Sequence, residues 1–182
     1  MSSPTRLVTL DDAETLADLV RANREFMRKW DPARPEEYYT TASQREVIAT
    51  FLVEHARGAA LPHLILTEQG RVVGRVTLTG IVRGAFQSAV LGYWVDQQHN
   101  GRGLASAATA DMVRRAFDDL GLHRVEAGAL VHNHASRRVL ERNGFVQYGL
   151  APGFLKIDGR WQDHVLYQRL NEDVQPLDAV TG

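Results

Sequence analysis

The sequence predicts an α+β fold with a mixed, mostly antiparallel central sheet that is flanked by helices. Three apolar, β-branched segments follow one another with only short turns between them, which is typical of antiparallel hairpins; they cover residues 62–67, 71–82 and 89–95. A further strand pattern at 124–131 follows an amphipathic helix, so it is expected to lie parallel to its neighbour in the sheet. Helical patterns before and between these strands supply the layers that cover the sheet.

The N-terminal region is predicted to begin with a short alternating strand at residues 5–9. Thr9 or Asp11 is expected to cap the helix that follows, because both side chains accept hydrogen bonds from free N–H groups. The predicted buried face of this helix consists of Leu16, Leu19, Val20, Asn23, Phe26 and Met27. Pro32 and Pro35 end the helix and force a loop.

A second helix is predicted to start at Ser43, with Glu46 three residues later completing a capping box, and to end at Gly58. Near the C-terminus, a short helix at 135–143 is ended by Gly144, and Asp158–Gly159 is a hairpin turn. The remaining predicted strands are 145–148, 154–157 and 161–170. We expect one domain over residues 1–170 and a flexible tail over 171–182.

Composition narrows the class of protein. The chain has 182 residues, 44% of them hydrophobic and 24% charged, which is typical of a globular domain. A formal net charge of −1 offers no field for attracting nucleic acid, and no apolar run approaches the ~20 residues of a membrane span. Cysteine is absent, which excludes disulfides, a thiol nucleophile and thiolate metal sites. The N-terminal residues lack the apolar core of a signal peptide. Together with the absence of cysteine, this leads us to expect a cytoplasmic protein, and we expect no metal site.

The stretch from Leu91 to Leu120 carries the strongest functional signal, because it reads as strand, loop and helix. Gly101 and Gly103 bracket Arg102 just before the helix, so the backbone there can approach a ligand closely. The free N–H groups at the helix start then form an anion cradle, best suited to a diphosphate. The predicted apolar face of the helix consists of Leu104, Ala108, Met112, Val113, Ala116, Phe117 and Leu120. Its predicted polar face consists of Ser106, Thr109, Arg114, Arg115 and Asp118.

Two nucleotide-binding motifs are alternative interpretations of this loop, and the sequence matches neither in full. A dinucleotide fingerprint requires a third glycine where the chain has Ser106, although Glu126 lies at about the spacing of a ribose-binding acid. That fingerprint also belongs among alternating strands and helices, whereas the segment upstream is strand after strand. The P-loop pattern is absent.

Gln98-x-x-Gly101-x-Gly103 followed by Leu104-Ala105 resembles the acetyl-CoA diphosphate loop of the GCN5-related N-acetyltransferases. The element order resembles that family's fold from about residue 5 to about residue 170. Residues 81–93 and 148–164 resemble the RimJ/RimL-type branch, which acetylates the N-termini of ribosomal proteins. The resemblance implies acetyl-CoA as the donor and a cofactor arm lying between separated fourth and fifth strands. Because the chain has no Cys and no Gly-x-Ser-x-Gly elbow, we expect direct attack by an amine on the thioester and no acyl-enzyme.

The resemblance also implies site residues. The expected cofactor-binding residues are Trp94, Val95, Gln98, Asn100, Gly101, Arg102, Gly103, Leu104, Ala105, Asn133 and Ser136, with a backbone N–H near Trp94 or Val95 polarising the thioester carbonyl. Arg102, Arg137 and Arg138 are candidates for the cofactor phosphates. Ser136 is the candidate proton donor to the departing thiolate, because Leu140 stands where many relatives carry a tyrosine.

The general base is left open. Glu126, His132, His134 and Tyr93 are candidates, against the alternatives of an ion pair with Arg124 for Glu126, solvated loop histidines, and core packing for Tyr93. An α-amine of pKa ~7.7–8.0 needs only a weak base, whereas a lysine amine near ~10.4 needs a strong one. Trp30, Phe86 and Trp161 are expected to line an acceptor groove, with simple packing as the alternative.

We therefore predict an acetyl-CoA-dependent N-acetyltransferase that acts on the N-terminal α-amine of a protein, with no direct binding of nucleic acid or membranes. The alternatives are an enzyme for small amines such as polyamines or aminoglycosides, a dinucleotide-dependent oxidoreductase, and an acyl-CoA sensor without turnover. The sequence does not determine the oligomeric state, and a homodimer is one of the alternatives.

Overall fold

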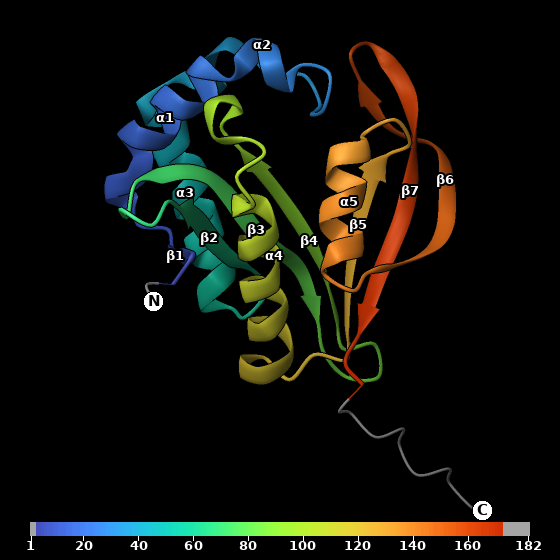
Figure 1. Cartoon of the computed structure of the whole chain (residues 1–182). Coiled ribbons are helices and arrows are strands. Elements are labelled where there is room, and N and C mark those ends of the chain that lie inside the picture. The colour runs from blue at the N-terminus through green and yellow to red at the C-terminus, as the bar shows by residue number, and fades with distance from the viewer. Residues whose placement is uncertain (1–2, 173–182) are drawn as a thin grey trace, which may run out of the picture.

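The computed structural model describes residues 3–172 and contains a seven-stranded sheet in the order β1-β2-β3-β4-β5-β7-β6 (Figure 1). The strands are β1 Thr5–Leu7, β2 Leu61–Leu66, β3 Val72–Val82, β4 Ser88–Val95, β5 Arg124–Leu130, β6 Val146–Ile157 and β7 Arg160–Leu170. All neighbours are antiparallel except β4 and β5, which are parallel. The predicted fold class and the predicted parallel strand are confirmed.

The single parallel contact divides the sheet into two halves. Only Ser88–Val90 of β4 pairs with β5, opposite Arg124–Glu126, although both strands continue for several residues beyond this point. Figure 1 shows the two strands moving apart toward the end of the molecule that carries α2 and α5. Beyond Val90 and Glu126, the facing edges of β4 and β5 therefore do not pair with each other, which leaves an opening in the middle of the sheet.

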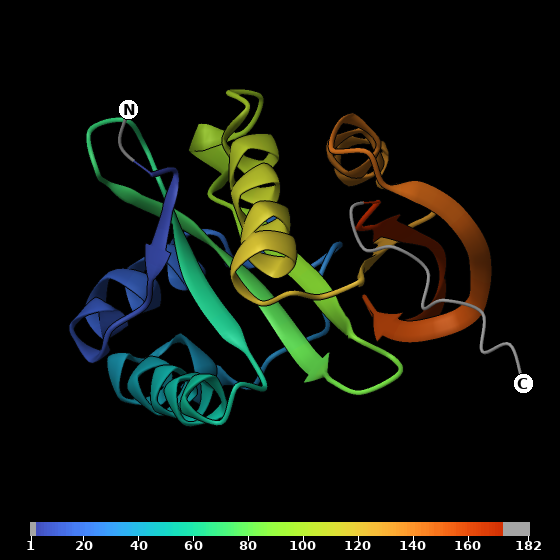
Figure 2. The same ribbon diagram turned by 90° about the horizontal axis from the view of Figure 1, so that it is seen from below.

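Helices cover both faces of the sheet: α1 and α3 lie on one face of the half that contains β2 and β3, α4 lies on its other face, and α5 packs on β5 of the second half (Figure 2). They are α1 Ala13–Ala22, α2 Arg24–Met27, α3 Thr41–Ala56, α4 Leu104–Arg114 and α5 His134–Arg142, with short turns at Leu10–Asp12, Glu36–Tyr39 and Gln97–His99. Residues of α1 and α3 pack with Leu64 and Val72 in one buried cluster. Residues of α4 and α5 pack with the inner strands in a second, larger cluster on the opposite face. Each of these helices except α2, which has no buried residue, thus buries residues against the sheet or a neighbouring helix.

Local signals placed some helix ends correctly and others wrongly. The first helical segment stops at Ala22, and α2 ends at Met27, before Pro32 and Pro35, which were predicted to end the helix. The cap of α3 is Thr40 and not Ser43: the Thr40 hydroxyl accepts the N–H of Ser43 at 3.2 Å, so Ser43 is the residue being capped. Gly58 ends this helix as predicted, with φ of 72° and its N–H donating to His55 O.

Thr109 was expected on the polar face of α4 but is completely buried. Its neighbours on the helix, Ala108 and Met112, are also buried, so the covered stripe is wider than the predicted one.

The C-terminal hairpin is longer and more regular than predicted. Residues 145–148 and 154–157 were expected to be separate strands, whereas β6 runs without interruption from Val146 to Ile157. Register shifts between Gln147 and Gly149 and between Ala151 and Leu155 absorb the irregular residues, so the prediction of two strands is wrong. The Asp158–Gly159 turn is confirmed by positive φ values of 49° and 75°. Of the predicted tail 171–182, residues 173–182 lie outside the described part of the chain.

Candidate active site

The opening between β4 and β5 presents backbone groups of β4 that no strand covers. The N–H of Asp96 donates to Val73 O of β3 at 2.7 Å. Because N–H groups along a strand point alternately to its two sides, the N–H of Val95 faces away from β3 and toward the opening. The structure therefore leaves a backbone donor at the predicted position, Trp94 or Val95, and identifies Val95 as that donor.

The loop between β4 and α4 has the geometry of an anion cradle. Gly101 and Gly103 have φ values of 77° and 78°, in the left-handed region that glycine favours. A Cβ atom built on either residue meets no protein atom within 4 Å, so the space beside the loop is open to a ligand. Gly103 caps α4, whose first N–H groups have no partner within the helix and carry its positive dipole end.

A buried polar network holds this loop against the first helices. Asn23 is 1% exposed; its amide donates to Asp96 Oδ1 at 2.9 Å, and its carbonyl accepts the N–H of Gln97 at 2.8 Å. The other oxygen of Asp96 lies 2.7 Å from Nδ1 of His99. These hydrogen bonds hold the pKa of Asp96 below its usual range despite burial, which acts to raise it. Sequence reasoning missed this network, because Asn23 is more than seventy residues away from its partners.

A groove of about 450 Å³ follows the opening and the loop. Of the predicted cofactor-binding residues, it is lined by Trp94, Val95, Asn100, Gly101, Gly103, Leu104, Ala105, Asn133 and Ser136. Gln98 and Arg102 do not line it and are exposed. Its lining also includes residues that were not predicted for this role: Phe26, Met27, His99, Ser106, Ala135, Val139 and Arg142. Phe26 and Met27 had been expected only as a buried helix face, and no local pattern distinguishes the two roles.

Among the arginines proposed for phosphates, Arg138 lines the groove, whereas Arg137 does not. The guanidinium of Arg137 donates to the Tyr167 hydroxyl at 3.0 Å and to Val131 O at 3.1 Å. Arg137 therefore ties α5 to the sheet, and its predicted phosphate contact is not supported by its position.

Tyr93 and Ser136 face each other across the opening. Their hydroxyl oxygens are 2.9 Å apart, and the tyrosine hydroxyl also lies within donating distance, 3.2 Å, of Ser136 O. Asn133 caps α5 by accepting the N–H of Ser136 at 3.1 Å, which fixes the serine in place. Burial raises the pKa of Tyr93 to about 12, so this hydroxyl keeps its proton at neutral pH and acts as a hydrogen-bond donor. Leu140 is buried in the core and takes no part in the groove.

Glu126 lies where β4 and β5 separate, but it is held by other side chains. One carboxylate oxygen accepts from Arg124 at 2.7 Å and from the Tyr148 hydroxyl at 2.6 Å. Glu126 does not line the groove that contains Ser136. The position favours the structural alternative for this residue over its predicted role as a base. The burial of Tyr148 and its bond to Glu126 raise the pKa of the tyrosine.

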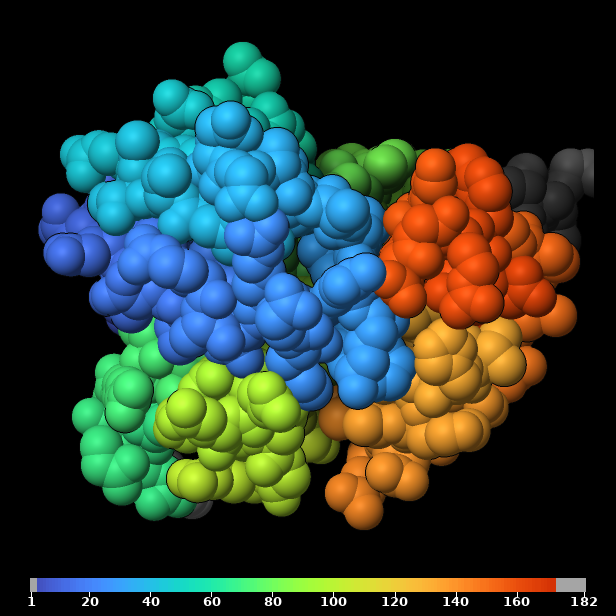
Figure 3. Space-filling model, turned by 90° about the horizontal axis from the view of Figure 1, so that it is seen from above, coloured from blue at the N-terminus to red at the C-terminus, as the bar shows by residue number. Residues whose placement is uncertain are grey.

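The three aromatic residues predicted for an acceptor groove do not lie together. Trp30 lines the cofactor groove, and its ring contacts His132 at 5.7 Å between centroids. Phe86 is in the loop before β4 and has only Arg124 over its ring, while Trp161 near the β6–β7 turn is 69% exposed. An ion pair of 3.3 Å between Arg28 and Asp158 joins the end of α2 to that turn. Figure 3 shows the two segments meeting above the opening.

The other predicted bases have little support from their surroundings. His132 contacts only Trp30 among the aromatic rings, and both His132 and His134 are exposed. Within residues 3–172, neither His132 nor His134 has a carboxylate partner that would orient it as a base.

The model of the acetyltransferase (GNAT) domain matches residues 5–146, most of the chain. The chain belongs to the GCN5-related N-acetyltransferases. It is 38% identical over 169 residues to "Probable N-acetyltransferase YjcK" of Bacillus subtilis (strain 168), covering 92% of this chain and 93% of that one. It is 33% identical over 172 residues to the [ribosomal protein uS5]-alanine N-acetyltransferase of Escherichia coli (strain K12), covering 94% and 89%.

The solved structure of Mycobacterium smegmatis RimJ in complex with CoA-disulfide superimposes with a TM-score of 0.89 at 31% identity, covering 94% of this chain and 83% of that chain. The present protein is thus an N-acetyltransferase of the RimJ/RimL type that uses acetyl-CoA. The groove fits this donor, because it combines an open glycine cradle for a diphosphate with an apolar wall beside an uncovered strand edge. No helix within residues 3–172 is both long enough and apolar enough to cross a bilayer.

Proposed function

We propose that this GNAT enzyme acetylates the N-terminal α-amine of a protein, with ribosomal proteins as the acceptor class. The observation that carries the proposal is an acetyltransferase groove for which two of the candidate bases, Glu126 and Tyr93, are not available to take a proton. Glu126 is engaged by Arg124 and Tyr148, and Tyr93 keeps its proton. An α-amine of pKa ~7.7–8.0 is partly neutral at pH 7, so it needs little help to lose its proton.

Relatives support the acceptor class. The Escherichia coli relative is named for the alanine of ribosomal protein uS5, and the similarity extends over 94% of this chain. A ribosomal acceptor would place the reaction in the cytoplasm, as the sequence predicts. Small amines are the weaker candidate, since the cofactor groove is lined by Arg138 and Arg142 and by no carboxylate. The adjoining cavity between the first helices and Trp94 has two carboxylates, Glu25 and Asp31, but four arginines.

We assign the following roles within the groove. Gly101, Gly103 and the first N–H groups of α4 bind the diphosphate of the donor. Acetyl-CoA supplies an acetyl group activated as a thioester. The Val95 N–H polarises its carbonyl oxygen where negative charge develops during attack.

The Tyr93–Ser136 pair is proposed to receive the departing sulfur. Since the tyrosine hydroxyl is within hydrogen-bond distance of Ser136 Oγ, the serine can donate toward the sulfur while accepting from the tyrosine. A thiol of pKa ~8.5 is already a fair leaving group, so a hydrogen bond is sufficient help. Tyr93 thus supplies, from β4, the tyrosine that the chain lacks at Leu140.

The test is a thiol-release assay with acetyl-CoA against N-terminal peptides, lysine peptides with blocked N-termini, and spermine. The proposal expects peptides that begin with alanine or serine to be the fastest acceptors at pH 7. Faster turnover of spermine or of lysine side chains would contradict the acceptor assignment. Tight binding of acetyl-CoA without turnover of any acceptor would favour the sensor alternative.

A further inference from the structure

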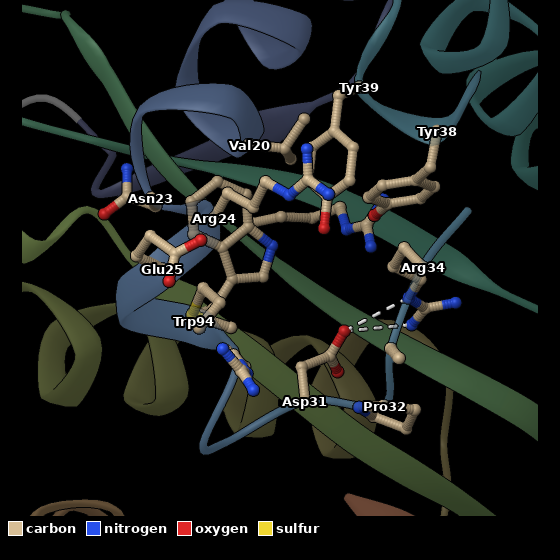
Figure 4. Close-up of a pocket in the computed structure, with 14 residues that line it drawn as sticks. Val20, Asn23, Arg24, Glu25, Asp31, Pro32, Arg34, Tyr38, Tyr39 and Trp94 are labelled. Carbon is tan, nitrogen blue, oxygen red and sulfur yellow. Dashed lines mark hydrogen bonds and ion pairs between the residues drawn. The ribbon is translucent and has the colours of Figure 1, made fainter. Parts of the chain in front are cut away.

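A second cavity, of about 290 Å³, adjoins the cofactor groove and has no assigned role. Figure 4 shows it between the first helices, the Asp31–Arg34 loop and Trp94. Met27 and Trp94 line both this cavity and the cofactor groove, so a molecule in the cavity lies next to the proposed reaction centre. An acceptor chain that reaches the opening from this side would place its first side chains here.

The cavity is rich in charge, but most of that charge is already paired. Four arginines and two carboxylates line it. Arg24 is bound by Glu36, Arg34 lies 3.1 Å from Asp31, and Arg28 pairs with Asp158 of the β6–β7 turn. Three of the four cations are therefore neutralised by the protein itself.

Arg75 is the fourth cation, and it has no anionic partner. It lies in the middle of β3, opposite Trp94 in the sheet, and is half-buried. Its guanidinium contacts the Phe51 ring at 5.4 Å, but within residues 3–172 it has no carboxylate within 4.0 Å and no hydrogen-bond acceptor. A half-buried guanidinium with five N–H donors is costly to leave unpaired, and a carboxylate matches its planar fork.

We infer that Arg75 binds an acidic side chain of the acceptor at position 2 or 3, where position 1 is the residue whose amine is acetylated. This inference rests on the proposed function, since it presumes a peptide acceptor. Side chains of an extended peptide lie ~3.3 Å apart along the chain, so only the first few residues reach a cavity that shares two residues with the cofactor groove. Glu25 also lines the cavity and has no ion pair within residues 3–172, so it opposes the bound carboxylate and limits its affinity.

The experiment compares peptides that begin with alanine and carry a single Glu or Gln at position 2, 3 or 4 of an otherwise neutral sequence. With saturating acetyl-CoA, wild-type enzyme should show a kcat/KM at least ~10-fold higher for Glu than for Gln at position 2 or 3. The preference should fall as salt is added.

Four variants test the assignment through the Glu-to-Gln ratio measured within each protein. Arg75→Gln should bring the ratio close to one, and Arg75→Lys should retain part of it because the charge remains. Glu25→Gln should raise the ratio. The control, Arg71→Gln, removes an exposed arginine at the start of the same hairpin and should keep the wild-type ratio.

Circular dichroism of each variant establishes that it is folded. A wild-type ratio near one, or a ratio that survives in Arg75→Gln, would overturn the inference while the neutral peptides still support the proposed function. If no peptide of either kind is acetylated, the proposed function fails and this inference falls with it.

Discussion

Gly74 offers a direct way to disturb the backbone that the proposed mechanism uses. A Cβ at this position would lie 2.2 Å from the carbonyl oxygen of Trp94 and 3.0 Å from Cα of Val95. Since a carbon and an oxygen need at least ~3.2 Å, Gly74→Ala must separate β3 and β4 locally by about 1 Å. Both contacts are with backbone atoms of β4, so no side chain can rotate away to relieve them.

Gly74→Ala is expected to lower both the stability of the protein and the rate of catalysis. Overpacking of this kind costs about 1–3 kcal/mol, which for a chain of this size lowers the Tm by roughly 2–12 °C. A shift of about 1 Å at Val95 misplaces the N–H that we propose to polarise the thioester, and such misplacement costs up to ~10²-fold in rate. We expect kcat to fall between ~10- and ~100-fold, while the dissociation constant of CoA changes by less than ~3-fold, because the glycine loop that anchors it is elsewhere.

Steady-state kinetics, calorimetric binding of CoA and a thermal melt measure the three quantities on one preparation. Gly92→Ala is the matched control. Like Gly74 of β3, Gly92 is a glycine within a strand, here β4, but a Cβ at Gly92 meets nothing within 4 Å. If Gly74→Ala retains the wild-type kcat and melting temperature, the strand contact is not as tight as described and the role of the Val95 N–H loses its support.

Three further predictions concern other parts of the chain. Gly103→Val forces a β-branched residue into φ of 78°, so CoA binding measured by calorimetry should weaken at least ~10-fold, about 1.4 kcal/mol; an unchanged affinity would rule out the cradle. Ser136→Ala should lower kcat by less than ~10²-fold without altering CoA affinity, and the trapping of an acetylated Ser136 by mass spectrometry would instead indicate an acyl-enzyme. Burial lowers the pKa of His63 to about 4, so between pH 6.5 and 4 the imidazole is protonated in the unfolded chain and neutral in the folded chain. The free energy of unfolding, measured by urea titration, should therefore decrease as the pH falls from about 6.5 to about 4. His63→Gln should flatten that slope, and a slope equal to that of wild type would assign it to other groups.

Features encoded by neighbouring residues were predictable from the sequence. The glycine cradle depends on residues 101 and 103 and on the helix that starts at once, and the Asp158–Gly159 turn depends on two adjacent residues. The cap of α3 was misplaced because Thr40 and Ser43 both satisfy the same local rule, and only the hydrogen bond decides between them.

Features formed by distant residues were not predictable from local patterns. The Asn23–Asp96 bond joins α1 to the loop after β4, and the Tyr93–Ser136 pair joins β4 to α5. Periodicity describes which face a residue occupies but not which partner it meets. The separation of β4 and β5 came from the family resemblance alone, and the pairing register confirms it.

The most direct test of the proposed function uses one peptide that offers both kinds of amine. The peptide begins with alanine, carries one internal lysine, and is incubated with the enzyme and acetyl-CoA at pH 7, after which fragmentation by mass spectrometry locates the acetyl group. We predict acetylation of the N-terminal amine alone, with a rate that levels off near pH ~8, close to the pKa of an α-amine. Acetylation of the lysine in preference to the N-terminus would contradict the acceptor that we propose for this enzyme.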